Sequence, residues 1–159
     1  MRILLAIDGS PSSEAAIEEV CRRPWPPDSE ARIVTVISHF ESMLMKAGNH
    51  DKQAYDDVLE HESMETARRL YDIASTIGQR APCLHVTPKL LIGKPTEAIL
   101  DEAEQWGADL IVVGSRGHGP VKRFFLGSVS LAIALHAPCS VEIVRGSPEV
   151  TGTETKKVS

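Results

Sequence analysis

The stretch ADLIVVGSRGHGPVKRFFLGSVS, residues 108–130, decides the fold. Its apolar run Leu110–Val113 stops at Gly114, and so short a run bounded by glycine is typical of a strand buried on both faces. A basic, glycine-punctuated loop follows and leads to Gly127, where an apolar helical period begins. Strand, loop and helix start are the parts of a phosphate-binding site, because glycine lets the backbone approach an oxyanion and a helix N-terminus offers unpaired N–H groups.

The segments around this stretch alternate between strands and helices. Short aliphatic runs predict strands at 2–7, 31–37, 84–91, 110–113 and 140–145, and helical periods predict helices at about 11–22, 58–77, 95–106 and 127–136. Ser10 and Pro11 begin the first helix, and Gly78 and Gly107 are expected to cap the second and third. Pro88 indicates that the third strand lies at an edge of the sheet. Five strands alternating with four helices predict a parallel α/β sheet with right-handed crossovers.

Length and composition are those of one globular domain. The chain has 159 residues, of which 42% are hydrophobic and 25% are charged. No apolar run is long enough to span a membrane, and the N-terminus lacks a signal-peptide pattern, so we expect a cytoplasmic protein with no membrane partner. A net charge of −5 argues against a nucleic-acid partner. We expect one domain over 1–146 and a polar, disordered tail over 147–159.

The cysteines and histidines predict neither disulfides nor a metal centre. Cys21, Cys83 and Cys139 are odd in number and widely spaced, which favours reduced side chains. The six histidines form no metal-ligand spacing.

Two familiar phosphate-binding motifs do not fit the organising loop. The glycine spacing from Gly114 to Gly119 is that of a P-loop, but Pro120 and Val121 stand where that motif requires Lys and then Ser or Thr. Residues 117–119 begin a dinucleotide-binding fingerprint, but Lys122 replaces its third glycine and the motif follows the fourth strand.

What remains is Gly-x2-Gly-x9-Gly-Ser, filled by Gly114, Gly117, Gly127 and Ser128. This pattern resembles the nucleotide-binding signature of the universal stress protein family. The opening ILLAIDGS and the closing LGSVSLAIALHAPCSVEIVR are also similar to that family, so the resemblance covers residues 1–146. It implies a single-domain, Rossmann-like sheet with strand order 3-2-1-4-5.

In that order the first and fourth strands are neighbours, and Asp8 and Gly114 face each other across a crevice at their carboxyl ends. We expect this crevice to hold ATP or another adenine nucleotide, with the phosphates on backbone N–H groups of the loop and of the last helix. The resemblance implies that Asp8 contacts the nucleoside or a water bound to Mg²⁺ or Mn²⁺, and that Val36 contacts adenine. The expected site residues are Ala6, Ile7, Asp8, Val36, Val113, Gly114, Arg116, Gly117, Gly127, Ser128 and Val129.

Each of these features also has a purely structural interpretation. Asp8 could close an Asx-turn after the first strand, since Gly9 follows it. The glycines could serve loop flexibility alone, and Arg116, Lys122 and Arg123 could be solvated charges. Residues 39–51 carry no sustained period and could be either a segment that covers the ligand or an excursion without contact to it.

Function follows the site. No pairing of a nucleophile with a base emerges from the spacing, so we expect no catalytic residues. The resemblance implies a regulatory nucleotide-binding module, and it leaves slow ATP hydrolysis open. The alternative is a dimeric interaction protein in which nucleotide is incidental. An adenylate-transferring enzyme is disfavoured because DGSPSS follows the first strand in place of that class's motifs. The resemblance also implies a homodimer through Val141–Arg145, although Glu142 and Leu131 depart from the family's usual residues.

Overall fold

The computed structural model describes residues 1–38, 52–117 and 126–146, with the side chains of 52–59 excepted. Its elements follow one another in the order β1 (Arg2–Ala6), α1 (Pro11–Arg22), β2 (Ser29–Ile37), α3 (Lys52–Arg80), β3 (Leu84–Ile92), α4 (Pro95–Trp106), β4 (Leu110–Gly114), α5 (Ser128–His136) and β5 (Ser140–Val144). The expected excursion at 39–51 and the expected tail at 147–159 lie outside the described residues.

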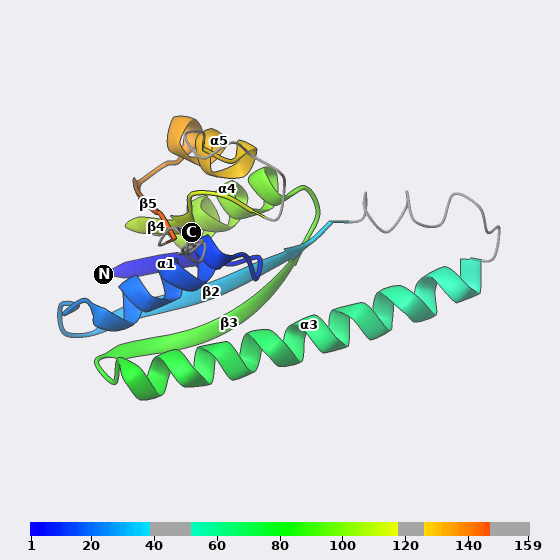
Figure 1. Ribbon diagram of the computed structural model, residues 1–159, viewed down its shortest axis with the longest axis horizontal. Helices are drawn as coiled ribbons and strands as arrows, with labels where there is room; N and C mark the ends of the chain where they lie inside the picture. The colour runs from blue at the N-terminus through cyan, green and yellow to red at the C-terminus, as the bar shows by residue number, and fades with distance from the viewer. Residues whose placement is uncertain (39–51, 118–125, 147–159) are drawn as a thin grey trace, which may run out of the picture.

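The five strands form one sheet in the order β3-β2-β1-β4-β5, and every neighbouring pair is parallel (Figure 1). The predicted fold and strand order are confirmed, and β3 with its Pro88 does lie at an edge. At the centre, Ala6 of β1 lies in register with Val34 of β2 and with Val113 of β4. The carboxyl ends of these three strands therefore meet at one place.

Alternation along the strands divides the core between the two faces of the sheet. Ile3 and Leu5 of β1 pack with residues of α1 and α3, whereas Leu4 packs with residues of α4 and α5. Each strand side chain points to the face opposite its neighbours, so a strand buried on both faces is apolar without interruption. Helices therefore cover both faces of the sheet (Figure 1).

The helix ends follow the sequence signals in two cases and differ in one. The Ser10 hydroxyl caps α1 by accepting from the Ser13 amide at 3.3 Å, and Gly107 ends α4 in the left-handed conformation with φ 68°. The expectation that Gly78 caps the second helix is wrong, because α3 continues to Arg80. Ile77 and Ala81 are buried on either side of the glycine, and this burial keeps the chain helical to Arg80, two residues before Pro82.

Among the described residues, no helix is long and apolar enough to cross a membrane.

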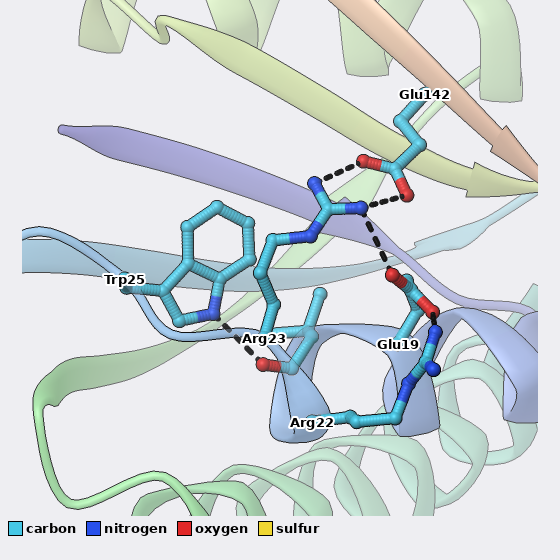
Figure 2. Close-up of polar contacts among 6 residues, drawn as sticks. Glu19, Arg22, Arg23, Trp25 and Glu142 are labelled. Atoms are coloured by element: carbon cyan, nitrogen blue, oxygen red, sulfur yellow. Dashed lines mark hydrogen bonds and ion pairs between the residues drawn. The ribbon is translucent and has the colours of Figure 1, made fainter.

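An ion cluster joins the outer strand β5 to the end of α1 (Figure 2). The Arg23 guanidinium binds both carboxylate oxygens of Glu142 at 2.6 and 2.7 Å and also one oxygen of Glu19 at 2.9 Å. Arg22 binds the other oxygen of Glu19. The ring of Trp25 lies 5.3 Å from the Arg23 guanidinium, and its indole N–H donates to the Val20 carbonyl. Glu142, unexpected on this strand, thus has a partner within its own chain.

This cluster predicts a pH-dependent contribution to stability. Hydrogen bonds from Arg22 and Arg23 hold the pKa of the Glu19 carboxyl below its usual value. A carboxyl with a lowered folded-state pKa stabilises the fold above its ordinary pKa, and this contribution is lost as the pH falls through the folded-state value. We expect the difference in free energy of unfolding between wild type and Glu19→Gln to be largest near neutral pH and to shrink below about pH 4.

Urea denaturation at a series of pH values measures this difference. Glu104→Gln, which changes an exposed carboxyl of α4 outside the cluster, is the matched control. A Glu19→Gln difference that stays constant as the pH falls would contradict the account.

Candidate functional site

A cavity of about 240 Å³ opens at the carboxyl ends of β1, β2 and β4. All eleven residues expected from the sequence line it: Ala6, Ile7, Asp8, Val36, Val113, Gly114, Arg116, Gly117, Gly127, Ser128 and Val129. Parallel strands whose crossovers leave in opposite directions create such a crevice at the point where the strand order reverses. The topology therefore brings together residues more than a hundred positions apart in the chain.

Five further residues line the cavity without having been expected: Ser13, Val34, Pro95, Ile99 and Ser130. Val34 could have been found, since it stands in register with Ala6 once the strand order is known. Ser130 lies in the first turn of α5, directly after the expected residues. Pro95 and Ile99 come from α4, and no motif in the sequence points from that helix to the crevice.

One side of the cavity is apolar. Val34, Val113 and Ile99 are buried side chains of the core on the α4 and α5 face of the sheet, and Val36 is partly buried beside them. Pro95 adds a further apolar surface at the start of α4. A wall of aliphatic side chains suits a flat heterocyclic ring, because such a ring buries apolar area on both faces.

Asp8 serves the turn after β1 and also faces the loop. Its Oδ1 accepts from the Ser10 amide at 3.0 Å, which is the Asx-turn considered from the sequence. Its Oδ2 lies beside Gly117, since a Cβ on that glycine would meet this oxygen at 2.8 Å. The turn and a position in the cavity are therefore compatible, and Gly117 leaves the space that the carboxylate occupies.

Gly114 lines the cavity and also packs closely against α1. A Cβ at this position would lie 2.6 Å from the Ser12 carbonyl carbon and 2.7 Å from the Ser13 nitrogen. These are backbone atoms of the first turn of α1, which cannot move away as a flexible side chain can. Gly114 is therefore required by the close packing of α1 against the end of β4, whatever the cavity holds.

The N-terminus of α5 forms the polar end of the cavity. Gly127 stands at the N-cap position and makes no side-chain hydrogen bond to the helix, and Ser128 and Val129 are its first two helical residues. Amides at these positions have no acceptor within their own helix, and the helix dipole adds positive potential there. The Gly127 amide is different, because it donates to the Ser115 carbonyl at 2.8 Å. The expectation that Gly127 offers its N–H to a phosphate does not fit this contact.

A second helix N-terminus, that of α1, also reaches the crevice, but the chain itself occupies it. The Ser10 hydroxyl caps this helix, and the Arg116 carbonyl accepts hydrogen bonds from the hydroxyls of Ser10 and Ser12. An anion entering the cavity would therefore meet the first turn of α5 and not that of α1.

Two basic residues considered from the sequence, Lys122 and Arg123, lie outside the described residues. Arg116 is described and lines the cavity, half-buried. No group of three or more histidine, cysteine, aspartate or glutamate side chains that could hold a metal ion occurs in the described part of the chain.

A model of the Universal stress protein family matches residues 1–145. The chain belongs to the universal stress protein family. A putative universal stress protein of Staphylococcus haemolyticus (strain JCSC1435) is 32% identical to this family member over 163 residues, which cover 98% of this chain and 94% of that protein.

Solved structures show the same fold. The hypothetical protein MJ0577 superposes with a TM-score of 0.78 at 22% identity, covering 92% of this universal stress protein and 96% of that chain. A universal stress protein family protein from Arabidopsis thaliana, solved with AMP bound, gives 0.64 at 17% identity and covers 97% of both chains. A universal stress protein in complex with cAMP gives 0.58 at 22% identity, covering 92% and 98%.

Proposed function

We propose that this universal stress protein binds ATP, or a closely related adenine nucleotide, in the crevice between β1 and β4 and acts as a regulatory module in a stress response. One observation carries the proposal: the cavity combines an apolar wall with the uncapped N-terminus of α5. Adenine packs against the wall, and the phosphates receive hydrogen bonds from the amides of Ser128 and Val129 and from the Ser128 hydroxyl.

The bound relatives support the choice of ligand class. AMP and cAMP, found in two structures of the same fold, share an adenine ring, a ribose and one phosphate. A site with an apolar wall and one helix N-terminus matches these shared parts. Further phosphates of ATP would extend from the start of α5 toward Gly117, in the loop after β4.

A divalent cation fits this site only in company with the nucleotide. Asp8 is the one acidic residue among the described residues that line the cavity. A single carboxylate leaves most positions of Mg²⁺ or Mn²⁺ to water and phosphate oxygens, which is how Mg²⁺ commonly binds beside nucleotides. Asp8 would hold the ion through water, and the ion would neutralise phosphate charge. The described lining residues include serine hydroxyls but no histidine, cysteine or lysine, and nucleotide binding is the proposed activity.

Isothermal titration calorimetry tests the proposal with protein shown to be free of nucleotide. ATP, AMP and GTP are titrated separately, each with Mg²⁺ present. Saturable binding of ATP, with GTP much weaker, is the expected result, because guanine carries more polar groups than adenine and their burial against an apolar wall is unfavourable. Failure of all three to bind would overturn the proposal and favour the interaction protein in which nucleotide is incidental.

The protein forms a homodimer through Val141–Arg145 in this account. Strand β5 pairs with β4 along one edge and leaves its other edge at the border of the sheet. A charged residue at such an edge ordinarily opposes pairing. Here the bidentate contact with Arg23 neutralises Glu142, so the carboxylate is no obstacle to a second copy.

Arg23→Gln is expected to shift this dimer toward monomer, because it leaves the Glu142 carboxylate without its partner at the pairing edge. Light scattering at micromolar concentration should give twice the 17.3 kDa chain mass for wild type and a lower average mass for the variant. Arg22→Gln is the matched control, since Arg22 binds Glu19 and does not touch Glu142. A wild-type mass of one chain would refute the dimer, and an unchanged dimer in Arg23→Gln would refute the role of the ion pair.

A further inference from the structure

The loop that leaves β4 is held at its second residue, Arg116, by the opening turn of α1. The Arg116 carbonyl accepts from the Ser10 hydroxyl at 3.0 Å and from the Ser12 hydroxyl, and the Arg116 amide donates to the Ser12 hydroxyl at 3.2 Å. Ser12 therefore contacts both backbone polar groups of one residue. The side chains involved are shielded from solvent, since Ser10 is 1% exposed and Ser12 is 5% exposed.

Ser115, the residue before Arg116, is fixed by contacts with the start of α5 and with β5. The Ser115 carbonyl accepts from the Gly127 amide at 2.8 Å and from the Ser130 hydroxyl at 3.1 Å, both at the start of α5. The Ser115 amide donates to the Val144 carbonyl of β5 at 2.7 Å. Ser115 and Arg116 thus form a junction at which the first turns of α1 and α5 are tied to the end of β4.

This junction sets the geometry of the phosphate end of the cavity. Four residues that line the cavity belong to the junction or lie next to it: Arg116 and Gly117 in the loop, and Gly127 and Ser128 at the start of α5. Ser12 itself does not line the cavity, so any effect it has on a ligand is transmitted through Arg116.

We propose that Ser12 is a positioning residue for phosphate recognition, its hydroxyl fixing the Arg116 peptide so that the start of the loop and the N-terminus of α5 keep their spacing around the phosphates. This inference rests on the proposed nucleotide site. Ser12 is a cleaner probe than Ser10, because Ser10 also caps α1 through the Ser13 amide. The contacts of the Ser12 hydroxyl are otherwise limited to a long one of 3.5 Å with the Ser10 hydroxyl among the described residues.

Without the Ser12 hydroxyl, the amide of the half-buried Arg116 loses its acceptor and the start of the loop relaxes to find another. This relaxation weakens the contacts with the phosphates but not those with the base, since the apolar wall belongs to β1, β2, β4 and α4. Ser12→Ala is therefore expected to weaken ATP binding about ten-fold while leaving the affinity for adenosine unchanged.

Calorimetry on wild type and Ser12→Ala, with ATP and with adenosine, tests whether the substitution weakens the binding of ATP alone. Ser29→Ala is the matched control, because it removes another buried hydroxyl, bonded to the Pro26 carbonyl at 2.7 Å at the opposite end of the sheet. It should lower stability and leave both affinities as in wild type. Equal ATP affinities in wild type and Ser12→Ala, or equal losses for ATP and adenosine, would overturn the positioning role while the nucleotide site stands.

A second pair keeps the test decisive if Ser12→Ala does not fold. Ser12→Thr and Ser12→Val have side chains of nearly the same size and differ in the hydroxyl alone. The threonine variant should bind ATP about ten-fold more tightly than the valine variant, with equal affinities for adenosine. Equal ATP affinities in this pair would overturn the inference. Wild-type protein that binds neither ligand would overturn the proposed function and this inference together.

Discussion

Replacing Ser128 with glutamate is expected to abolish ATP binding and to leave the protein at least as stable as wild type. Ser128 is exposed at the first position of α5 and lines the cavity. An acidic side chain there favours the helix by about 0.3–1 kcal/mol through the helix dipole. The same carboxylate repels a phosphate, and two unit charges about 4 Å apart at a partly solvated site interact by roughly 4 kcal/mol, which is more than a hundred-fold in affinity.

The opposite directions of these two effects make the experiment informative. A variant that loses binding because it unfolds would show lower thermal stability, whereas Ser128→Glu should melt at or above the wild-type temperature. Ala134→Glu carries the same charge on the same helix, at an exposed position that does not line the cavity, and should bind ATP as wild type does. ATP affinity that survives in Ser128→Glu would show that the phosphates do not lie at the start of α5.

Gly114→Ala is expected to destabilise the fold by about 2–4 kcal/mol, whether or not nucleotide is present. The new Cβ would meet backbone atoms of Ser12 and Ser13 at distances under 3 Å, so α1 must shift from the end of β4. That shift also disturbs the contacts of Ser10 and Ser12 with Arg116. Urea denaturation followed by circular dichroism measures the loss.

Gly78→Ala is expected to raise the free energy of unfolding and serves as the control for Gly114→Ala. Gly78 lies inside α3, and a Cβ there would meet no atom within 4 Å. Alanine in a helix interior is more favourable than glycine by about 0.5–1 kcal/mol, so this variant should gain stability by that amount. A urea concentration at half-unfolding that is the same for Gly114→Ala and wild type would contradict the packing role assigned to Gly114.

The elements of this fold could be predicted from local signals, because each is encoded within its own segment. The apolar runs of the strands, the cap at Ser10 and the left-handed cap at Gly107 act over a few residues. The strand order could not be read from periodicity and came from the family resemblance. Gly78 does not end its helix, because a glycine marks a helix end only where burial does not continue the helix past it, and Ala81 is buried.

The site was predictable as a set of residues, while the reasons for individual residues were not. The loop motif and the end of β1 converge because the topology places them there. The packing that requires Gly114 depends on atoms about a hundred residues away, and no local pattern records such a contact. The same is true of the bond between Ser12 and Arg116 and of the ion pair between Arg23 and Glu142. Long-range polar contacts of this kind leave no spacing in the sequence.

The most direct measurement follows the backbone amides of ¹⁵N-labelled protein by nuclear magnetic resonance as ATP is added, with adenosine in a parallel titration. The account predicts that the amides of Ser128 and Val129 shift strongly with ATP and much less with adenosine, whereas residues of the apolar wall, such as Val36, respond to both. ATP binding that leaves the Ser128 and Val129 amides unmoved would contradict the account. Chemical-shift changes confined to the groove between α1 and α3, which is lined by Glu14, Glu18 and Asp72, would also contradict it.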